Sequence, residues 1–259
     1  MLNEIVSQDH KLVKKLASLK EKKYRERYGE FLVEGALSVE WALNSPYEVR
    51  DIVVSRDFVM PKALAELTEG RRVYTVPEHV FAKIADTKTP QGILCSCAFA
   101  GRPEMPEQGL FVYCDAVRDP GNLGTIIRTA DAMGFDGVVL SPDCVDPTGP
   151  KLVRSTMGSL FHIALYSGVT HNELLSWQEK GFTLAASALS DKAVSSKDWQ
   201  ATDKTVIIMG NESAGVSREL IEKADTVVKI PMAGSAESLN VAAAAAILMY
   251  EAAKSCHKI

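Results

Sequence analysis

The residues of this chain that are best suited to chemistry follow three short apolar segments, each of which breaks at Gly or Pro. After the first segment, Asn122 and Gly124 stand where a helix is predicted to begin, and the free backbone N–H groups of a helix N-terminus can bind an anion. Asn is also a preferred helix cap, so capping alone is the alternative role for Asn122. Arg128 lies further along the same helix, where it is either a solvated side chain or part of a site.

The second and third segments end in loops of small and polar residues. The second runs through Ile208-Met209 into Gly210-Asn211-Glu212, and the third runs through Ile230 into Pro231-Met232. Open α/β sheets bind ligands at the carboxyl ends of their strands, so backbone groups from both loops can hold one ligand. Glu212 follows its strand closely, which suits either a structural acceptor for the N–H groups of the turn or a base or orienting group.

The last predicted helix, at 239–254, begins beside Ser238 and Asn240 and carries an unbroken alanine run. Ser238 is expected to cap this helix, with Asn240 in its first turn. A helix that is apolar on all sides is expected to be buried. The small side chains of Ala242–Ala246 would also let other backbone approach closely.

The familiar motifs for phosphate, metal and nucleophile sites are missing from the sequence. Neither the G-x-G-x-x-G dinucleotide pattern nor the Walker A pattern occurs, and no His or Cys pair has metal-binding spacing. No Ser stands in the context of a nucleophile elbow. The residues therefore favour a ligand held by backbone groups and apolar walls, which suits an adenosine-bearing cofactor, and they predict no metal.

The composition is that of an ordinary globular protein. The chain has 259 residues, 46% of them hydrophobic and 24% charged, which predicts one or two domains. No apolar run reaches the roughly 18 residues that a membrane helix needs, and the first residues lack the apolar core of a secretory signal. The five cysteines do not form the pattern of a disulfide framework, which indicates the cytoplasm.

The net charge of −4 argues weakly against nucleic acid as a partner, but the charge is unevenly spread. A basic segment at 11–27 with interleaved tyrosines is a candidate phosphate-binding element, and a solvated helix face is the alternative. Its basic residues are Lys11, Lys14, Lys15, Lys20, Lys22, Lys23, Arg25 and Arg27.

Helices and strands alternate along the chain, which predicts an α/β fold with a domain at 1–100, a Pro- and Gly-rich linker at 101–109 and a second domain at 110–259. In the first domain we expect helices at 10–23, 36–43, 61–68 and 78–85 and strands at 31–33, 51–54, 72–76 and 93–99. In the second we expect a parallel sheet of strands at 111–117, 137–140, 161–165, 182–186, 205–209 and 226–230. Its crossover helices are expected at 123–133, 150–157, 171–179, 217–224 and 239–254.

Taken together and in this order, three segments resemble the motifs of the SpoU (TrmH-type) RNA ribose 2′-O-methyltransferases. They are Asn122-x-Gly124-x-x-x-Arg128-Thr129-Ala130, Gly210-Asn211-Glu212-x-x-Gly215-Val216-Ser217, and Ile230-Pro231-Met232 with Ser238-Leu239-Asn240-Val241. The resemblance covers 110–255, and the first domain is similar to the small ribosomal-protein-like RNA-binding domain of the larger members. Ala242 is a departure, because many members carry Ser there.

The resemblance implies a deep trefoil knot in the second domain, against the general rule that chains avoid knots. It also implies S-adenosyl-L-methionine as the cofactor and a homodimer that completes the active site. The implied cofactor residues are Ile208, Met209, Gly210, Asn211, Ile230, Pro231, Met232, Ser238 and Leu239. The implied catalytic residues are Asn122, Arg128, Glu212 and Asn240. Together with the basic segment, the resemblance implies RNA contacts at Lys14, Lys15, Lys22, Lys23, Arg25 and Arg154.

The implied reaction moves a methyl group from a sulfonium to a ribose 2′-hydroxyl, and the extra N-terminal domain favours ribosomal RNA as the substrate. Because a guanidinium is a poor base at neutral pH, we favour an Arg128 that binds a phosphate while Glu212 or a water accepts the proton. Asn122 and Asn240 would orient the ribose or Arg128. The alternatives are a tRNA ribose methyltransferase, a methyltransferase that acts on a base, and a catalytically silent RNA-binding or ribosome assembly factor.

Overall fold

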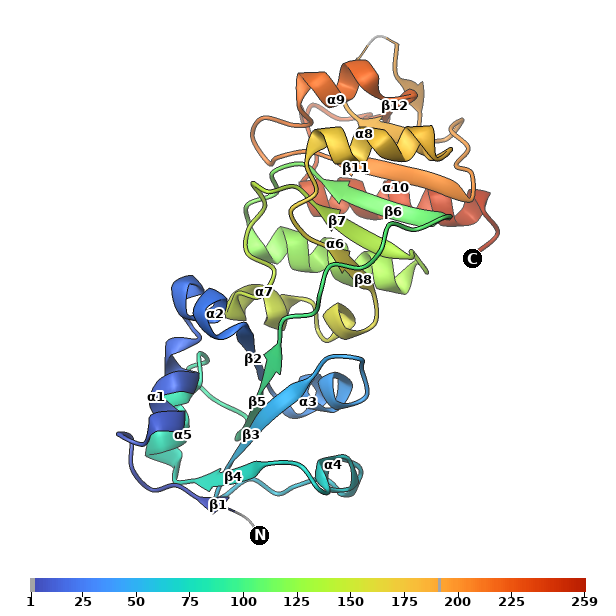
Figure 1. Ribbon diagram of the computed structural model, residues 1–259. Coiled ribbons are helices and arrows are strands. Elements are labelled where there is room, and N and C mark those ends of the chain that lie inside the picture. The colour runs from blue at the N-terminus through green and yellow to red at the C-terminus, as the bar shows by residue number, and fades with distance from the viewer. Residues whose placement is uncertain (1–2, 191) are drawn as a thin grey trace. The chain divides into compact units, whose positions relative to one another are not determined.

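The computed structural model describes residues 3–190 and 192–259, which form two compact units, each with its own sheet (Figure 1). The first unit comprises the chain up to Gly101 together with Asp146–Phe161. The second comprises Arg102–Val145 and His162–Ile259. The sequence-based division, with domains at 1–100 and 110–259, puts Asp146–Phe161 in the other unit.

The first unit is built on a five-stranded mixed sheet with the order β1-β4-β3-β5-β2. β4 is parallel to β1 and β3, whereas β5 is antiparallel to β2 and β3. The strands are β1 Asn3–Glu4, β2 Glu30–Glu34, β3 Val49–Ser55, β4 Val73–Val76 and β5 Ile93–Ala98. The helices are α1 Lys11–Ser18, α2 Lys22–Tyr28, α3 Ala36–Leu43, α4 Lys62–Thr68, α5 Glu78–Ile84 and α7 Pro150–Ser155, with a 3-10 turn η1 at Ser159–Phe161.

The predicted helix at 10–23 is wrong in one respect, because the structure breaks it into α1 and α2. Arg25 provides a physical reason: its Nη1 donates hydrogen bonds to the carbonyl oxygens of Leu19 and Lys20, at 2.8 and 2.7 Å. Carbonyl groups at a helix end need such partners outside the helix. Arg25 is only 4% exposed, so it has a structural role here and is not presented to RNA.

Arg25 also holds the segment Asp146–Phe161 in the first unit. Its Nε donates a hydrogen bond to Oδ2 of Asp146 at 3.2 Å. At the other end of the segment, Gly158 has a φ of +94° and packs against Trp41, where an added Cβ would lie 1.3 Å from the ring. The packing of this segment therefore requires a buried cation at one end and a residue without a side chain at the other.

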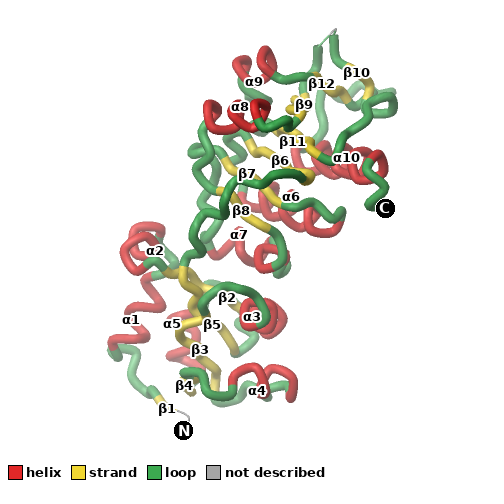
Figure 2. The backbone as a smooth tube through the Cα atoms, turned by 45° about the vertical axis from the view of Figure 1, so that its right-hand side comes forward, coloured by secondary structure: helices red, strands yellow, loops and turns green. Residues whose placement is uncertain are grey.

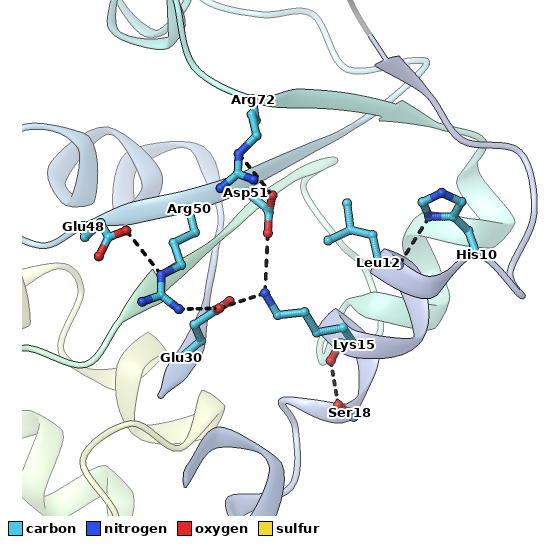
Figure 3. Close-up of polar contacts among 9 residues, drawn as sticks. All are labelled: His10, Leu12, Lys15, Ser18, Glu30, Glu48, Arg50, Asp51 and Arg72. Atoms are coloured by element: carbon cyan, nitrogen blue, oxygen red, sulfur yellow. Dashed lines mark hydrogen bonds and ion pairs between the residues drawn. The ribbon is translucent and has the colours of Figure 1, made fainter. Parts of the chain in front are cut away.

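A network of ion pairs holds α1 against β2 and β3 (Figure 3). Lys15 Nζ lies 2.7 Å from Glu30 Oε1 and 3.6 Å from Asp51 Oδ2, and these two acidic side chains are only 3% and 7% exposed. Arg50 reaches the same Glu30 oxygen at 2.7 Å, and Arg72 lies 3.8 Å from Asp51. Burial favours a neutral Glu30, but hydrogen bonds from Lys15 and Arg50 outweigh it and lower the pKa of Glu30. Lys15, predicted to contact RNA, is thus engaged with two carboxylates.

The second unit is built on a seven-stranded sheet with the order β10-β12-β9-β11-β6-β7-β8, in which neighbouring strands are parallel. The strands are β6 Gly109–Cys114, β7 Gly137–Leu140, β8 Ala164–Tyr166, β9 Thr183–Ser187, β10 Val194–Ser195, β11 Lys204–Met209 and β12 Thr226–Lys229. The helices are α6 Pro120–Ala132, α8 His171–Glu179, α9 Arg218–Lys223 and α10 Val241–Ser255.

Helices cover both faces of this parallel sheet, as the sequence predicts. α6 and α10 pack on each other on one face, and α8 and α9 cover the other (Figures 1 and 2). Trp177 of α8 and Leu220 of α9 share a buried cluster with Phe111 of β6. The predicted strand at 161–165 is displaced, because η1 occupies its first residue and β8 begins at Ala164.

The register of the strands brings several loops to one edge of the sheet. The last residue of β11, Met209, pairs with the last residue of β6, Cys114, and the end of β12 pairs with the end of β9 at Val228 and Ser187. The loops that follow these strands therefore gather at the same carboxyl edge. The knot that the resemblance implies stays a prediction.

Several features bear on the class of protein. Within residues 3–190 and 192–259, no helix combines the length and the apolar character needed to cross a bilayer. Over the same residues, no three His, Cys, Asp or Glu side chains gather closely enough to hold a metal ion. The five cysteines are free thiols, and three of them are buried.

We expect Lys15→Met to lower the free energy of unfolding by about 2 kcal/mol, because two nearly buried carboxylates lose a cation. The partial exposure of Lys15 and the remaining arginines keep the loss below that of a fully buried pair. Lys14→Met is the matched control, since Lys14 pairs with Asp9 and both side chains are largely exposed. Its effect should stay below about 0.5 kcal/mol. Denaturant unfolding at pH 7 measures both, and equal losses would contradict the structural role of Lys15.

Candidate active site

A cavity of about 430 Å³ opens beside the loops that follow β9, β11 and β12 in the second unit. This volume falls within the roughly 300–1,000 Å³ of small-molecule sites. Most of the predicted cofactor residues line the cavity: Met209, Gly210, Asn211, Ile230, Met232, Ser238 and Leu239. Among the lining residues that the structure describes, Ile208 and Pro231 do not occur, and Ile208 is fully buried within β11.

The loop after β11 is folded tightly on itself by Asn211. The backbone N–H groups of Asn211 and Gly215 donate hydrogen bonds to each other's carbonyl oxygens, at 3.0 and 2.9 Å. The side-chain oxygen of Asn211 accepts from the N–H groups of Ser213 and Ala214. At Gly210 an added Cβ would lie 2.0 Å from the carbonyl carbon of Gly215. The loop therefore requires Gly at 210, and its backbone comes directly to the cavity wall.

Glu212 connects this loop to the start of α6. Its carboxylate accepts hydrogen bonds from the N–H groups of Asp119 and Arg118, at 3.0 and 3.3 Å, and from Nδ2 of Asn122 at 3.1 Å. Burial favours the neutral form, but the hydrogen bonds from Asp119 and Asn122 outweigh it and hold the pKa of Glu212 below its ordinary value. A carboxylate stabilised in its ionised form is a weak base, so the geometry favours the orienting role for Glu212.

Asn122 and Asn240 complete the connection between the three motif loops. Nδ2 of Asn240 donates a hydrogen bond to Oδ1 of Asn122 at 3.0 Å. Since the amide nitrogen of Asn122 donates to Glu212, its oxygen is free to accept this bond. Glu212, Asn122 and Asn240 therefore form a continuous chain of hydrogen bonds, which brings three of the four predicted catalytic residues together.

The predicted cap of the last helix is wrong, and capping is not the role of Asn122. Asn240, not Ser238, caps α10, because its side-chain oxygen accepts from the N–H groups of Ala242 and Ala243. Asp119 caps α6 by accepting from the N–H of Asn122, which therefore lies in the first turn. Because Asp119 supplies the capping oxygen of α6, the side chain of Asn122 can bond to Glu212 and Asn240 instead.

Arg128 lies on the exposed side of α6, outside the residues that line the cavity. It lies six positions beyond Asn122, which is about 9 Å along the helix axis at 1.5 Å per residue. Among the residues that the structure describes, no hydrogen bond or ion pair engages its guanidinium. A site that uses Arg128 must therefore extend beyond the cavity toward the exposed surface of α6.

Sequence reasoning missed one wall of the cavity. Ser187, Ala188 and Leu189 line it at the end of β9, and Lys229 and Glu237 contribute charged groups. The strand at 182–186 was predicted, but without the order of strands its end could not be placed beside β11 and β12. The prediction of a parallel sheet does contain one signal for this wall, because parallel strands of one sheet have their carboxyl ends at the same edge.

The predicted RNA-binding residues differ in how freely they are presented. Arg25 is buried, and Lys15 bridges two nearly buried acids. The others form ion pairs at or near the surface: Lys14 with Asp9, Lys22 with Glu26, Lys23 with Glu21, and Arg154 with Asp86. Lys22 and Lys23, at 66% and 67% side-chain exposure, remain the most accessible of the set.

The model of the SpoU rRNA Methylase family matches residues 109–250. The chain therefore belongs to this family, which confirms the resemblance. A second model, that of the MRM3-like substrate binding domain, matches residues 10–95. Among curated relatives, the 23S rRNA (guanosine(2553)-2′-O)-methyltransferase RlmP of Bacillus subtilis is 39% identical, over 96% of this chain and 98% of its own.

Solved structures of family members share the architecture of the whole chain. An AdoMet-bound rRNA methyltransferase from Sinorhizobium meliloti superimposes with a TM-score of 0.88 at 33% identity, over 98% of each chain. The SpoU methyltransferase AviRb from Streptomyces viridochromogenes, in complex with the cofactor AdoMet, gives a TM-score of 0.83 at 28% identity, over 95% of this chain and 97% of its own. These matches confirm the predicted α/β fold with a parallel sheet and a smaller N-terminal domain.

We expect Glu212→Gln to loosen the connection to α6, because a Gln amide group presents donors where one carboxylate oxygen accepts hydrogen bonds from N–H groups. Exchange of the Asp119 amide hydrogen should become about five-fold faster, as for the loss of about 1 kcal/mol. In the wild type, protection of the Asp119 amide hydrogen should fall at acid pH. Folding lowers the pKa of Glu212, so its carboxylate stabilises the folded protein above the ordinary pKa of a glutamate. This stabilisation is lost as the pH falls through the lowered pKa of the folded protein. Glu222→Gln, which removes only an exposed pair with Arg218, should leave the Asp119 exchange unchanged.

Proposed function

We propose that this protein is an S-adenosyl-L-methionine-dependent RNA methyltransferase that methylates a ribose 2′-hydroxyl in 23S ribosomal RNA. The observation that carries the proposal is the hydrogen-bonded chain from Glu212 through Asn122 to Asn240, which joins the family motifs beside the cavity. Two relatives support the substrate class: RlmP, and a 23S rRNA (uridine(2479)-2′-O)-methyltransferase from Streptomyces viridochromogenes, which is 31% identical over 89% of this chain and 84% of its own.

The residues around the cavity fit S-adenosyl-L-methionine. The bare backbone at Gly210 is an observation in favour, because the loop brings main-chain groups where a side chain would not fit. Met209, Ile230, Met232 and Leu239 supply apolar walls, and polar groups come from Ser238, Glu237 and Lys229. We assign these residues, with Asn211, to the cofactor. Ile208 is buried within β11, and Pro231 is exposed outside the cavity lining, so we assign neither to direct contact. When bound, the cofactor supplies the electrophilic methyl group.

Arg128 is the residue that we assign to the ribose. A guanidinium remains protonated at neutral pH, so it cannot serve as the base, but it can bind a phosphate and stabilise negative charge on the attacking hydroxyl oxygen. Glu212 orients Asn122 and is occupied by N–H donors, so we assign acceptance of the proton to water. Asn122 and Asn240 hold the start of α6, and thereby Arg128, relative to the cofactor loops.

A homodimer would complete this site, and the surface of α10 supports it. The helix is not buried on all sides as predicted, because Ala243 is exposed and Ile247 and Tyr250 have exposures of 38% and 49%. Exposed apolar residues at i, i+4 and i+7 form one stripe along a helix, which a second subunit can cover.

We also retain the cytoplasm as the compartment, which the free thiols support.

The function is tested by mapping 2′-O-methyl groups in 23S rRNA made with and without this protein, and by methyl transfer in vitro. Arg128→Ala should lower the rate about 100-fold or more while cofactor affinity stays unchanged. Arg102→Ala, which removes a surface pair with Glu173, serves as the control and should keep full activity. An Arg128→Ala enzyme with more than half the wild-type rate contradicts the assigned role.

Two other outcomes would favour the alternative functions. A wild-type protein that binds no cofactor supports the catalytically silent assembly factor, and methylation found in tRNA supports a tRNA methyltransferase.

The most accessible lysines of the basic segment provide a separate test of RNA binding. A double change of Lys22 and Lys23 to Gln should reduce the slope of log affinity against log salt by about 1.5, because each phosphate contact contributes about 0.7–0.9. A double change of the exposed Lys180 and Lys197 to Gln removes the same charge from the second unit and should leave the slope unchanged. Equal slopes for the Lys22 and Lys23 variant and the wild type would remove this segment from the RNA interface.

A further inference from the structure

His171, the first residue of α8, lies between two carboxylates that neither the motifs nor the proposed mechanism uses. Its Nε2 is 2.9 Å from Oδ1 of Asp115, just beyond β6, and its Nδ1 is 3.3 Å from Oε2 of Glu219 on α9. The Asp115 side chain is 8% exposed and that of His171 is 27% exposed. The histidine therefore joins three elements behind the cofactor loop.

Asp115 is bonded to both ends of the loop after β11. Its N–H donates a hydrogen bond to the carbonyl oxygen of Met209 at 2.7 Å, where the loop begins. Its Oδ2 accepts from the N–H of Ser217 at 2.8 Å, where the loop ends. Asp115 thus closes the segment between these residues, which forms one wall of the cavity. The bond to Met209 comes from the backbone of Asp115, so its side chain positions the end of the loop at Ser217.

The geometry favours a doubly protonated His171, because each ring nitrogen faces a carboxylate oxygen. An ionised carboxylate only accepts hydrogen bonds, so each ring nitrogen must carry a hydrogen to bond its acid. A neutral imidazole would place a lone pair against Asp115 or Glu219. Burial favours the neutral ring, but the hydrogen bonds from His171 to Asp115 and Glu219 outweigh it and raise the pKa of His171 above its ordinary value of about 6.5.

Other charged groups border the same region and must be considered with the histidine. Asp143, Arg118 and Arg218 line a hollow of about 670 Å³ that includes Asp115 and His171. Lys223 pairs with Glu219 at 2.7 Å and Glu222 pairs with Arg218 at 2.7 Å, which offsets part of each charge. The Tyr113 ring lies 6.3 Å from the imidazole, and its hydroxyl donates to the carbonyl of Val169. The charges in direct contact with His171 are the carboxylates of Asp115 and Glu219.

We propose that the imidazolium of His171 is a positioning residue for the cofactor loop, acting through Asp115, and that its deprotonation loosens the loop. The proposal rests on the proposed function, since it takes the loop from Met209 to Ser217 as a wall of the cofactor site. Folding raises the pKa of His171, so the imidazolium contacts are fully present below the ordinary pKa of a histidine. They are lost as the pH rises through the raised pKa of the folded protein. Cofactor affinity should therefore decline above neutral pH.

The test compares the dissociation constant of S-adenosyl-L-methionine from pH 6 to pH 9 in the wild type and in His171→Gln. The wild type should bind about ten-fold more weakly at the alkaline end, as expected for the loss of one charged hydrogen bond. The ligand's own amino group also titrates near pH 8, so the readout is the difference between the two profiles. His171→Gln should bind about ten-fold more weakly at pH 6 and lack the additional decline. His257→Gln, an exposed residue near the C-terminus, should follow the wild type.

A second variant and a measurement without cofactor separate this proposal from the function itself. Glu219→Gln changes a half-exposed side chain and should move the alkaline decline to lower pH, because one of the two acids that stabilise the imidazolium is lost. In the cofactor-free protein, exchange of the Ser217 amide hydrogen should accelerate in His171→Gln. Unchanged Ser217 exchange, or a His171→Gln profile that matches the wild type, would overturn the role of His171. Absence of cofactor binding by the wild type, with Ser217 exchange still dependent on His171, would overturn only the function.

Discussion

The hydrogen bond from the Asn240 amide to the side-chain oxygen of Asn122 is the contact on which the rest of the site depends. It joins residues 118 positions apart, one in the first turn of α6 and the other at the cap of α10. Because Asn122 also donates to Glu212, one side chain relates three loops to one another. The side chain at position 122 must donate a hydrogen bond to the Glu212 carboxylate and accept one from the Asn240 amide. An Asp has no donor when ionised, and a Ser hydroxyl is shorter, so an amide suits the position best.

The parallel sheet makes this contact possible. Strands that end in register deliver their loops to one edge, where short side chains can meet across large sequence distances. The loop after β11 then needs little more than its own backbone: Asn211 ties it internally, Gly210 allows the close approach, and Asp115 joins its two ends. The result is a wall made mainly of main-chain groups. This explains why no phosphate, metal or nucleophile motif identified the site.

The sequence predicted the parts of the fold that depend on local patterns. Apolar runs located six of the strands of the second sheet within a few residues, and the carboxyl-end rule selected Met209, Gly210 and Ile230 as residues of one cavity. The errors arose where a distant residue decides. Ser238 and Asn240 are both good caps, and the choice between them depends on where α10 begins and on Asn122. The wall at Ser187–Leu189 required the order of the strands, which no local pattern contains.

A count of charges cannot distinguish two kinds of cation in the basic segment, for the same reason. Lys15 and Arg25 stand in a basic run, but each faces acids that lie far away in the sequence and are largely buried. Desolvated ion pairs of this kind are costly to break, because the remaining carboxylate stays in a poor environment for charge. Lys22 and Lys23 pair with exposed acids within the same run, and such pairs contribute little. A phosphate can therefore replace those partners at small cost, so an acidic protein can still offer RNA a local cationic surface while its other cations maintain the fold.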